Sequence, residues 1–258
     1  RVAAPLAGTY FLGPPLEVDG TLYVLGEDLG QVRLHALEPR SGEPLWSVPL
    51  ANADADIEAD FDRRLAGLSP TLAGGLLVCP TGSGLIVAVD PLTRSVQWGT
   101  QYRESKADLI QQQFRRGPFL GVAGPQFQDV TVEDLLRQSG WEDSCIVAAG
   151  SALLVATPDV AEPGDQRMLL CLDLLDGSTR WHRGRGEALY VGGVFEQTVL
   201  LVGSRQVQGV SLVDGKTQWS LPIEEPCGRG VLSGSLYHLP LRGGQIVTLD
   251  VAEPRLLA

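Results

Sequence analysis

The sequence has few of the residues that define several common classes of protein. Only 6% of its 258 residues are aromatic, one is methionine and four are cysteines. The cysteines, Cys79, Cys145, Cys171 and Cys227, are separated by 66, 26 and 56 residues, which matches neither a disulfide framework nor a zinc motif. No apolar run approaches the roughly 18 residues that a membrane-spanning helix needs. We therefore expect no disulfide scaffold, no zinc site and no transmembrane segment.

Basic residues are also few relative to acidic ones. Lys and Arg number 20 against 31 Asp and Glu, which gives a formal net charge of -11. This balance counts against a nucleic-acid partner and an anionic membrane surface, because both require a positively charged face. The chain begins at Arg1 without a basic-then-apolar leader, so we expect a processed or trimmed protein.

One pattern recurs along a chain that is 44% hydrophobic and rich in turn residues, with 31 Gly and 17 Pro. Each copy contains an apolar strand, a turn, a second strand that ends near an acidic residue, then Gly and Trp. The copies cover residues 22–46, 76–98, 153–181 and 199–219, and a fifth begins at residue 236. A repeat of this kind indicates one supersecondary unit used several times.

The spacing inside the copies is constant. An acidic residue precedes Trp by eight positions in three copies. Serine holds this place in the fourth copy, and an acidic residue begins it in the fifth, so the five positions are Glu38, Asp90, Asp173, Ser211 and Asp250. The midpoint is occupied by Gly42, Arg94, Gly177 and Gly215, and the end by Trp46, Trp98, Trp181 and Trp219. This pattern predicts a hairpin in which the first side chain accepts hydrogen bonds from turn amides and Gly adopts positive φ. The indole is then expected to wedge between neighbouring sheets.

A further apolar segment precedes each copy, so that each unit offers four short strands. The last starting positions lie 38 and 39 residues apart, whereas the earlier gaps are 52 and 83 residues. A period of about 40 residues is the size of a β-propeller blade. The longer gaps predict insertions, of which residues 99–143 are expected to form a small helical excursion between blades 2 and 3. A second, acidic-then-basic insertion covers residues 51–65.

The Asp-x3-Gly-x3-Trp pattern resembles the tryptophan-docking repeat of the PQQ-like propeller family, which is typified by quinoprotein alcohol dehydrogenases and BamB. The resemblance implies an all-β propeller of four-stranded antiparallel blades, four complete and a fifth partial, over residues 1–258. Either the chain is a fragment of a longer propeller, or residues 2–10 close the fifth blade as a strand. The resemblance also implies an extracytoplasmic location.

Several local motifs have simpler interpretations than a binding site. The alternating acids from Asp54 to Asp62 resemble a calcium loop, but Ala59 and Leu65 stand where an EF-hand needs Gly and Glu, so a solvated loop is expected. Residues 81–84 (TGSG) lack a following Lys or helix and predict a hairpin turn. The three histidines, His35, His182 and His238, show no ligand or catalytic-triad spacing. We expect buried, reduced thiols at the cysteines.

Strand starts and connecting loops ring the mouth of a propeller's channel. The candidate ligand-binding or partner-binding residues there are Arg64, Trp141, Asp143, Arg185 and Arg229. An arginine cluster in this place could hold a carboxylate or phosphate, or it could form salt bridges between blades.

The family's enzymes use adjacent cysteines, calcium ligands and a catalytic Asp, and this sequence matches none of these residue by residue. We therefore assign no catalytic and no metal-binding residue and expect no cofactor. The favoured hypothesis is a non-catalytic scaffold that binds a protein partner, preferably a basic one. The alternative is part of a pyrroloquinoline-quinone-dependent dehydrogenase whose PQQ and calcium site is completed by missing blades. Carbohydrate or peptide binding at the channel mouth is a third possibility.

Overall fold

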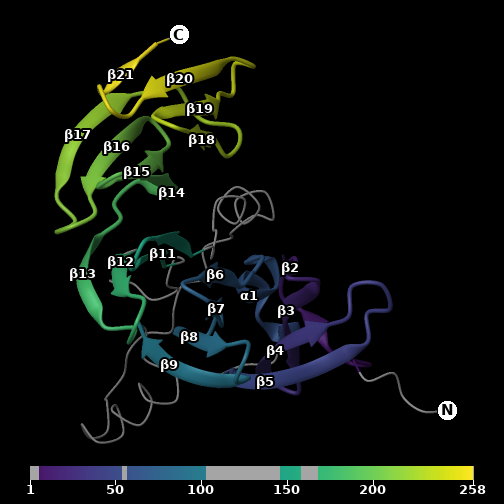
Figure 1. Ribbon diagram of the computed structural model, residues 1–258. Coiled ribbons are helices and arrows are strands. Elements are labelled where there is room, and N and C mark those ends of the chain that lie inside the picture. The colour runs from purple at the N-terminus through teal and green to yellow at the C-terminus, as the bar shows by residue number, and fades with distance from the viewer. Residues whose placement is uncertain (1–5, 54–56, 103–145, 158–167, 258) are drawn as a thin grey trace, which may run out of the picture. The chain divides into compact units, whose positions relative to one another are not determined.

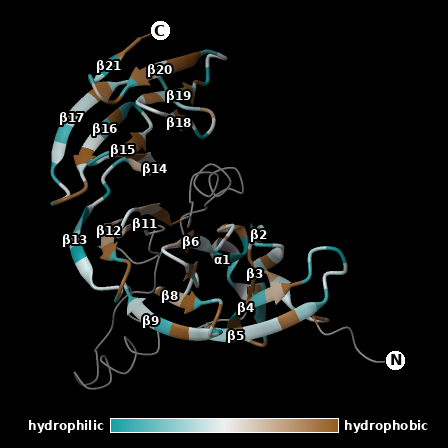
Figure 2. Ribbon diagram, viewed as in Figure 1, coloured by the Kyte–Doolittle hydropathy of each residue, from teal (hydrophilic) through white to brown (hydrophobic). Residues whose placement is uncertain are grey.

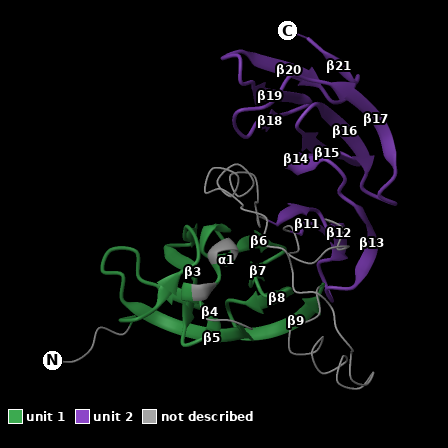
Figure 3. Cartoon of the chain, turned by 180° about the vertical axis from the view of Figure 1, so that it is seen from behind, with its two compact units in different colours: residues 1–140 green, residues 141–258 purple. Residues whose placement is uncertain are grey.

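The computed structural model describes residues 6–53, 57–102, 146–157 and 168–257, and the described chain is built almost wholly of antiparallel strands (Figure 1). Two short helical segments accompany them, the 3-10 helix η1 (Ile57–Ala59) and the helix α1 (Phe61–Leu65). The chain divides into two compact units, residues 1–140 and 141–258 (Figure 3).

The first unit contains two sheets. The first sheet consists of β1 (Tyr10–Phe11), β2 (Leu16–Val18), β3 (Thr21–Asp28), β4 (Gln31–Leu37) and β5 (Pro44–Asn52). Strands β1 and β2 both pair with β3, at opposite ends of it. The second sheet consists of β6 (Thr71–Ala73), β7 (Leu76–Pro80), β8 (Leu85–Asp90) and β9 (Ser95–Gln101), in that order. Each sheet therefore follows the simple up-and-down order of a propeller blade.

The facing sides of these two sheets share one apolar core. Leu25 and Leu34 of the first sheet and Leu77 and Val87 of the second belong to the same buried cluster. The alternation of side chains along a strand places one set of residues on this shared face. Burial of apolar side chains is the main stabilising contribution here.

The second unit contains three sheets with the same order of strands. The first of them consists of β10 (Val147–Ala149), β11 (Ala152–Ala156), β12 (Met168–Asp173) and β13 (Thr179–Gly184). The next consists of β14 (Ala188–Phe195), β15 (Thr198–Gly203), β16 (Gln206–Ser211) and β17 (Thr217–Pro222). The last consists of β18 (Val231–Ser233), β19 (Leu236–Pro240), β20 (Ile246–Asp250) and β21 (Arg255–Leu256).

Middle and outer strands of the second unit differ in their burial. All five residues of β11 are buried, and β15 is buried at all but its first residue. The outer strands β13 and β17 alternate exposed and half-buried residues, and Figure 2 shows them mainly teal and white. A strand whose residues are all apolar is typically covered by other elements on both faces. A strand whose exposed residues alternate is covered on one face only. The cores between adjacent sheets of this unit lie around Leu201 and around Tyr237.

The fold predicted from the repeat is confirmed, with corrections at both ends. The described chain forms five blade-like sheets, and the fifth has its own outer strand, β21. The alternative in which residues 2–10 close this fifth sheet is wrong for Tyr10, which pairs with Glu27 in the first sheet; residues 2–5 lie outside the described residues. The local reason is that β3 extends beyond β2 and leaves edge positions for β1.

The two predicted insertions have different outcomes. Strand β9 continues to Gln101, so the first residues of the 99–143 segment still follow the repeat, and its two predicted helices lie outside the described residues. In the 51–65 segment, β5 continues to Asn52, and η1 and α1 take the place of the expected loop. Within the described ranges, no helix is long and apolar enough to cross a membrane.

Candidate functional site

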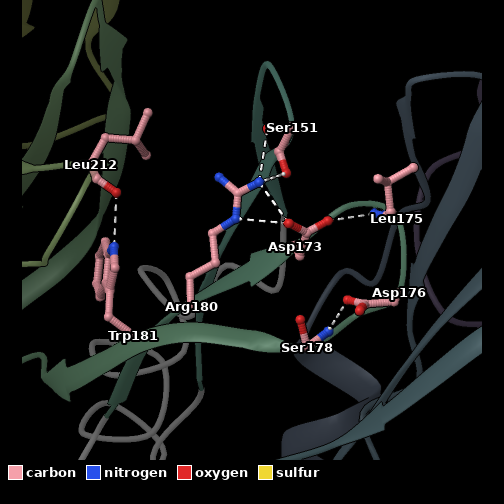
Figure 4. Close-up of polar contacts among 8 residues, drawn as sticks. All are labelled: Ser151, Asp173, Leu175, Asp176, Ser178, Arg180, Trp181 and Leu212. Atoms are coloured by element: carbon pink, nitrogen blue, oxygen red, sulfur yellow. Dashed lines mark hydrogen bonds and ion pairs between the residues drawn. The ribbon is translucent and has the colours of Figure 1, made fainter.

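The acidic residue of each repeat organises the turn that follows it, as Figure 4 shows for Asp173. Its carboxylate accepts a hydrogen bond from the amide of Leu175 at 2.8 Å. Its backbone carbonyl accepts from Gly177 N at 2.9 Å, and its own amide donates to Ser178 O at 2.8 Å. The hydrogen bond from Leu175, followed by that from Arg180, lowers the pKa of Asp173. The turn is therefore fixed by a side chain that remains ionised.

The other four turns use the same contact, which confirms the predicted role of this position. Each accepting side chain bonds to the amide two residues further along: Glu38 to Arg40, Asp90 to Leu92, Ser211 to Val213 and Asp250 to Ala252. The midpoint residues have the predicted positive φ: Gly42 70°, Arg94 56°, Gly177 71° and Gly215 72°. Arg94 adopts this conformation although it carries a Cβ, which makes it the strained member of the set.

A shared irregularity precedes the tryptophan in four sheets. Each indole-bearing residue stands opposite a small residue of the neighbouring strand: Trp46 opposite Ala36, Trp98 opposite Ala88, Trp181 opposite Cys171 and Trp219 opposite Gly209. In all four pairs the register shifts immediately beside this position. Such a bulge redirects the side chains of one strand. The repeat thus aims a large ring over a small residue.

Trp181 shows how this ring joins one sheet to the next (Figure 4). Its indole Nε1 donates a hydrogen bond to the carbonyl of Leu212 at 2.8 Å. A Cβ placed on Gly215 would lie 2.7 Å from the ring atom Cε3, so only glycine allows this approach. Because Trp181 lies on β13 and Leu212 follows β16, the predicted docking between neighbouring sheets is confirmed for this residue.

Arginines near Trp181 also bind within and between sheets. Arg180 contacts Asp173 through Nε at 3.1 Å and Nη2 at 2.8 Å, and Nη2 also donates to the carbonyl and hydroxyl of Ser151 at 2.9 and 2.8 Å. Arg183 Nη1 donates to Gly215 O at 2.8 Å and to Thr217 Oγ1 at 2.9 Å in the next sheet. Arg180 therefore stabilises its own sheet, and Arg183 joins its sheet to the next one.

The structure places a buried ion pair beside the predicted site residue Arg64. Arg63 Nη2 lies 3.0 Å from Glu27 Oε2, and the two side chains are 3% and 1% exposed. Asp60 caps α1 by accepting a hydrogen bond from Arg63 N at 3.1 Å, and the absence of a Cβ at Gly82 leaves room for the Arg63 side chain. The pair ties α1 to the end of β3. Arg63 was not among the predicted site residues. The only sequence signal for the helix that orients its side chain is the capping residue Asp60.

Arg64 itself points elsewhere. It is exposed, and its guanidinium carbon lies 6.0 Å from the centre of the Tyr10 ring. The Tyr10 hydroxyl donates to the Arg64 carbonyl at 3.5 Å. Arg64 therefore stands at the surface of the first unit, near β1.

The remaining predicted site residues have different environments. Arg185, before β14, is only 3% exposed, so it is a buried residue and not an open surface cation. Arg229, before β18, is exposed, and its guanidinium carbon lies 4.7 Å from the centre of the Tyr190 ring. Trp141 and Asp143 lie outside the described residues. Of the five, Arg64 and Arg229 present their charge at the surface of the described chain.

A buried tyrosine pair supports the segment that carries Arg229. The hydroxyl groups of Tyr190 and Tyr237 lie 3.3 Å apart. Tyr190 OH also donates to Gly228 O at 3.3 Å and accepts from Gly230 N at 3.2 Å. Burial, followed by the hydrogen bond to Tyr190, raises the pKa of Tyr237 well above its usual range. The residues on both sides of Arg229 are thus fixed, and a planar cation on a fixed backbone suits a carboxylate or phosphate.

Other predicted motifs have structural roles. Residues 81–84 form the β7–β8 turn, as predicted, with the Thr81 hydroxyl donating to Leu85 O at 2.7 Å. In the described ranges, no group of three or more His, Cys, Asp or Glu is arranged to hold a metal ion. Burial raises the pKa of Cys79 and brings that of Cys171 to about 11. The prediction of buried, reduced thiols is correct for these two, but Cys227 is exposed, and Cys145 lies outside the described residues.

Comparisons with known proteins agree with this architecture. The sequence profile of a family described as "Outer membrane protein assembly factor BamB" matches residues 7–116. BamB from Moraxella catarrhalis is similar in structure, with a TM-score of 0.54 and 13% identity over 96% of this chain and 62% of that one. No curated protein sequence matches the chain.

Enzymes with the same fold are equally similar. A europium-containing methanol dehydrogenase matches with a TM-score of 0.55 and 13% identity over 96% of this chain and 51% of its own. Quinohemoprotein alcohol dehydrogenase from Comamonas testosteroni matches with a TM-score of 0.55 and 13% identity, over 96% of this chain and 42% of its own. At such identities the likeness shows the fold. The chain spans less than two thirds of the length of each of these three proteins.

Proposed function

We propose that this protein, whose sheets have the fold of PQQ-like propeller blades and whose residues 7–116 match the BamB family model, is a non-catalytic scaffold that binds another protein. The fold alone does not select this function, because binding proteins and dehydrogenases share it. The contacts of the repeat's polar side chains support the scaffold.

The observation that carries the proposal is that the repeated polar groups bind the protein's own chain. The acidic or serine side chain of every repeat bonds to turn amides. Arg180 and Arg183 bond to backbone and side-chain groups of their own or the next sheet. These contacts stabilise blades and leave such residues little capacity for a substrate. The result is a rigid framework whose loops are free to vary.

Arg229 offers the partner a local contact. It is exposed beside Tyr190 on a segment that is fixed by hydrogen bonds from Tyr190. We propose that it binds a carboxylate of the partner, while the net charge of -11 favours approach by a partner that is basic overall. The extracytoplasmic location implied by the family resemblance is part of the same proposal.

Cross-linking in the source cell, followed by mass spectrometry, tests the scaffold role. We expect one or more defined partners, whose yield falls about 1.4- to 5-fold in Arg229→Ala, because an exposed charge-assisted contact contributes about 0.2 to 1 kcal/mol. Arg205→Ala removes another exposed arginine and should leave the yield unchanged. Equal loss in both variants, or no partner at all, contradicts the proposal.

The structural likeness to two dehydrogenases supports one alternative, in which the chain is part of a quinone-dependent enzyme. In that case, the PQQ and calcium site would be completed by blades other than those of this chain. The test is to add PQQ and Ca²⁺ to the purified protein, remove free cofactor by gel filtration, and record the cofactor's absorbance and alcohol oxidation with an artificial electron acceptor. Retained cofactor with turnover would replace the scaffold proposal.

A further inference from the structure

One turn position carries an exposed aliphatic side chain in three consecutive repeats. It lies two residues after the acidic or serine side chain of the turn, and it is occupied by Leu92, Leu175 and Val213, which are 90%, 83% and 73% exposed. The turn uses only the backbone amide of this residue, which donates to the Asp or Ser side chain. The turn therefore places no requirement on the side chain, and Arg40 and Ala252 occupy this position in the other two repeats.

Leu175 and Val213 project from the same end of two neighbouring sheets of the second unit, β10–β13 and β14–β17. The amide of the residue before Leu175 donates to Ser151 O at 3.0 Å, and that of the residue before Val213 donates to Gln197 O at 2.8 Å. Each apolar tip is thus fixed to the turn between the first two strands of its sheet. All six turns at this end of the unit lie in the described ranges. Both tips are therefore held in place before binding, which lowers the entropy cost of a contact.

Glu196 adds a strained residue to this end. It opens the turn between β14 and β15 with φ 50°, whereas glycines hold this place in the sheets before and after it, Gly150 at 59° and Gly234 at 60°. Glycine adopts this conformation without steric cost, and a residue with a Cβ does not. The Glu196 side chain is exposed and has no hydrogen-bond or ion-pair partner within the described ranges. The turn itself therefore gives no reason for a glutamate here.

The charge beside the two tips is negative. Asp176 follows Leu175 directly, and a hydrogen bond from Ser178 N at 2.8 Å holds its carboxylate and lowers its pKa. Glu196 stands in the turn that is bonded to the turn of Val213. The basic residues of these turns are already bonded within the chain: Arg180 to Asp173, Arg183 to Gly215 O and Lys216 to Asp214. Two carboxylates without a cation among the described residues thus accompany two exposed apolar side chains.

We propose that this end of the second unit, formed by Leu175, Asp176, Glu196 and Val213, binds a segment of a partner protein in which apolar side chains stand beside Lys or Arg. The apolar side chains of that segment cover the two tips, because exposed aliphatic residues that recur at one place mark an interaction site. Its cations complement the two carboxylates, which orients the segment and selects the partner. The inference rests on the proposed scaffold function, for which it names a surface and the chemistry of the partner segment.

The first test uses a labelled amphipathic peptide built of Leu and Lys as the probe. Fluorescence anisotropy should show saturable binding to the full chain. A peptide with Glu in place of Lys lacks the cations, and one with Ser in place of Leu lacks the apolar side chains. Each of these should bind at least about tenfold more weakly, because the site requires both kinds of side chain.

Substitutions locate the binding. Leu175→Ser together with Val213→Ser removes both tips and should weaken binding at least about tenfold. Leu29→Ser makes the same kind of change at a leucine that is 99% exposed in the first unit, and it should leave binding unchanged. Circular dichroism verifies that these variants are folded.

Glu196→Gly separates a binding role from a structural one. It removes a carboxylate, so binding should weaken about 1.4- to 5-fold, as for an exposed charge pair. It also relieves the positive-φ strain, so the urea midpoint of unfolding should rise. A residue with only a structural role would not move binding and stability in opposite directions.

The second test identifies the natural segment. Val213 or Leu29 is replaced by photoreactive benzoylphenylalanine in the full chain, and partners are cross-linked in the source cell. Partner peptides captured from position 213 should carry aliphatic residues beside Lys or Arg, and position 29 should not capture them.

Three results would overturn the inference: equal binding of the three peptides, unchanged binding by the double variant, or cross-links from position 213 to segments without this chemistry. A partner that is cross-linked only through other surfaces would contradict this site and still support the scaffold role. Failure of the site can therefore be told from failure of the proposed function.

Discussion

The indole Nε1 of Trp181 donates to the carbonyl of Leu212 at 2.8 Å, across the boundary between two sheets (Figure 4). The ring also covers the positive-φ glycine of the next turn, Gly215. One side chain thus combines a hydrogen bond with apolar packing at the same junction. The two contributions can be separated by substitution.

Replacing Trp181 should destabilise the protein in two steps. Trp181→Phe keeps an aromatic ring but removes the donor, and should lower the free energy of unfolding by about 1 kcal/mol. Trp181→Ala also removes the packing of a half-buried ring and should cost about 2 to 3 kcal/mol. Urea unfolding followed by circular dichroism measures both. Equal losses in the two variants would show that the hydrogen bond carries the junction and that ring packing contributes nothing.

Replacing Arg94 should stabilise the protein, unlike replacing Trp181, because the Arg94 backbone is strained. Arg94 has φ 56° at the place where three other repeats have glycine, and a residue with a Cβ costs roughly 1 to 2 kcal/mol in this conformation. Because glycine gains more entropy on unfolding, Arg94→Gly should stabilise by about 0.5 to 1 kcal/mol.

The reverse substitution provides the matched control. Gly177→Ala introduces a Cβ at φ 71° and should destabilise by about 1 kcal/mol or more. Thermal unfolding of both variants beside the unsubstituted protein gives the comparison. Destabilisation by Arg94→Gly would mean that the arginine side chain contributes more than its backbone strain costs.

The contrast between Asp173 and Arg63 explains how much the sequence could predict. The turn at Asp173 depends on contacts within about five residues, so the spacing of Asp, Gly and Trp specified it, and with it the blades. The side chain of Arg63 is buried because a one-turn helix directs it at Glu27, 36 residues away in sequence. A long-range packing relation of this kind leaves no local pattern in the sequence, so Arg64 was predicted as a site residue and Arg63 was not.

The same reasoning applies to the other site residues. Burial of Arg185 depends on neighbouring elements that the local sequence does not specify. Local turn chemistry was predictable, whereas exposure and edge pairing required the assembled sheets.

Removing one partner of the buried pair of Arg63 and Glu27 should lower the free energy of unfolding strongly, whereas replacing both should lower it little. Arg63→Met removes the guanidinium from a carboxylate that is 1% exposed and should destabilise by about 3 to 5 kcal/mol. Glu27→Gln should cost less, because Asp60 Oδ2 still lies 3.7 Å from Arg63 Nη1. The double variant removes both charges and should recover most of this loss. A double-mutant cycle from urea unfolding measures the coupling. Additive losses would show that the pair does not act as a unit.

His35 should make the stability of the protein sensitive to acid. It is 5% exposed, and neither ring nitrogen has a hydrogen-bond partner among the described residues. Burial and the positive charge of Arg33 lower its pKa below 6.5, while Asp28 opposes them. The folded protein therefore keeps His35 neutral at a pH where the unfolded chain binds a proton.

The sign of the effect follows from this difference in proton binding. As the pH falls below about 6.5, the unfolded state gains protons that the folded state does not, so the free energy of unfolding should decrease, by at most about 1.4 kcal/mol per pH unit. This loss should stop once the pH passes below the lowered pKa of the folded state. His35→Gln cannot be protonated and should remove this part of the pH dependence, whereas His182→Gln, at an exposed residue, should leave it. Urea unfolding between pH 7.5 and pH 5 on the three proteins makes the comparison, and parallel curves for the unsubstituted protein and His35→Gln would show that another group is responsible.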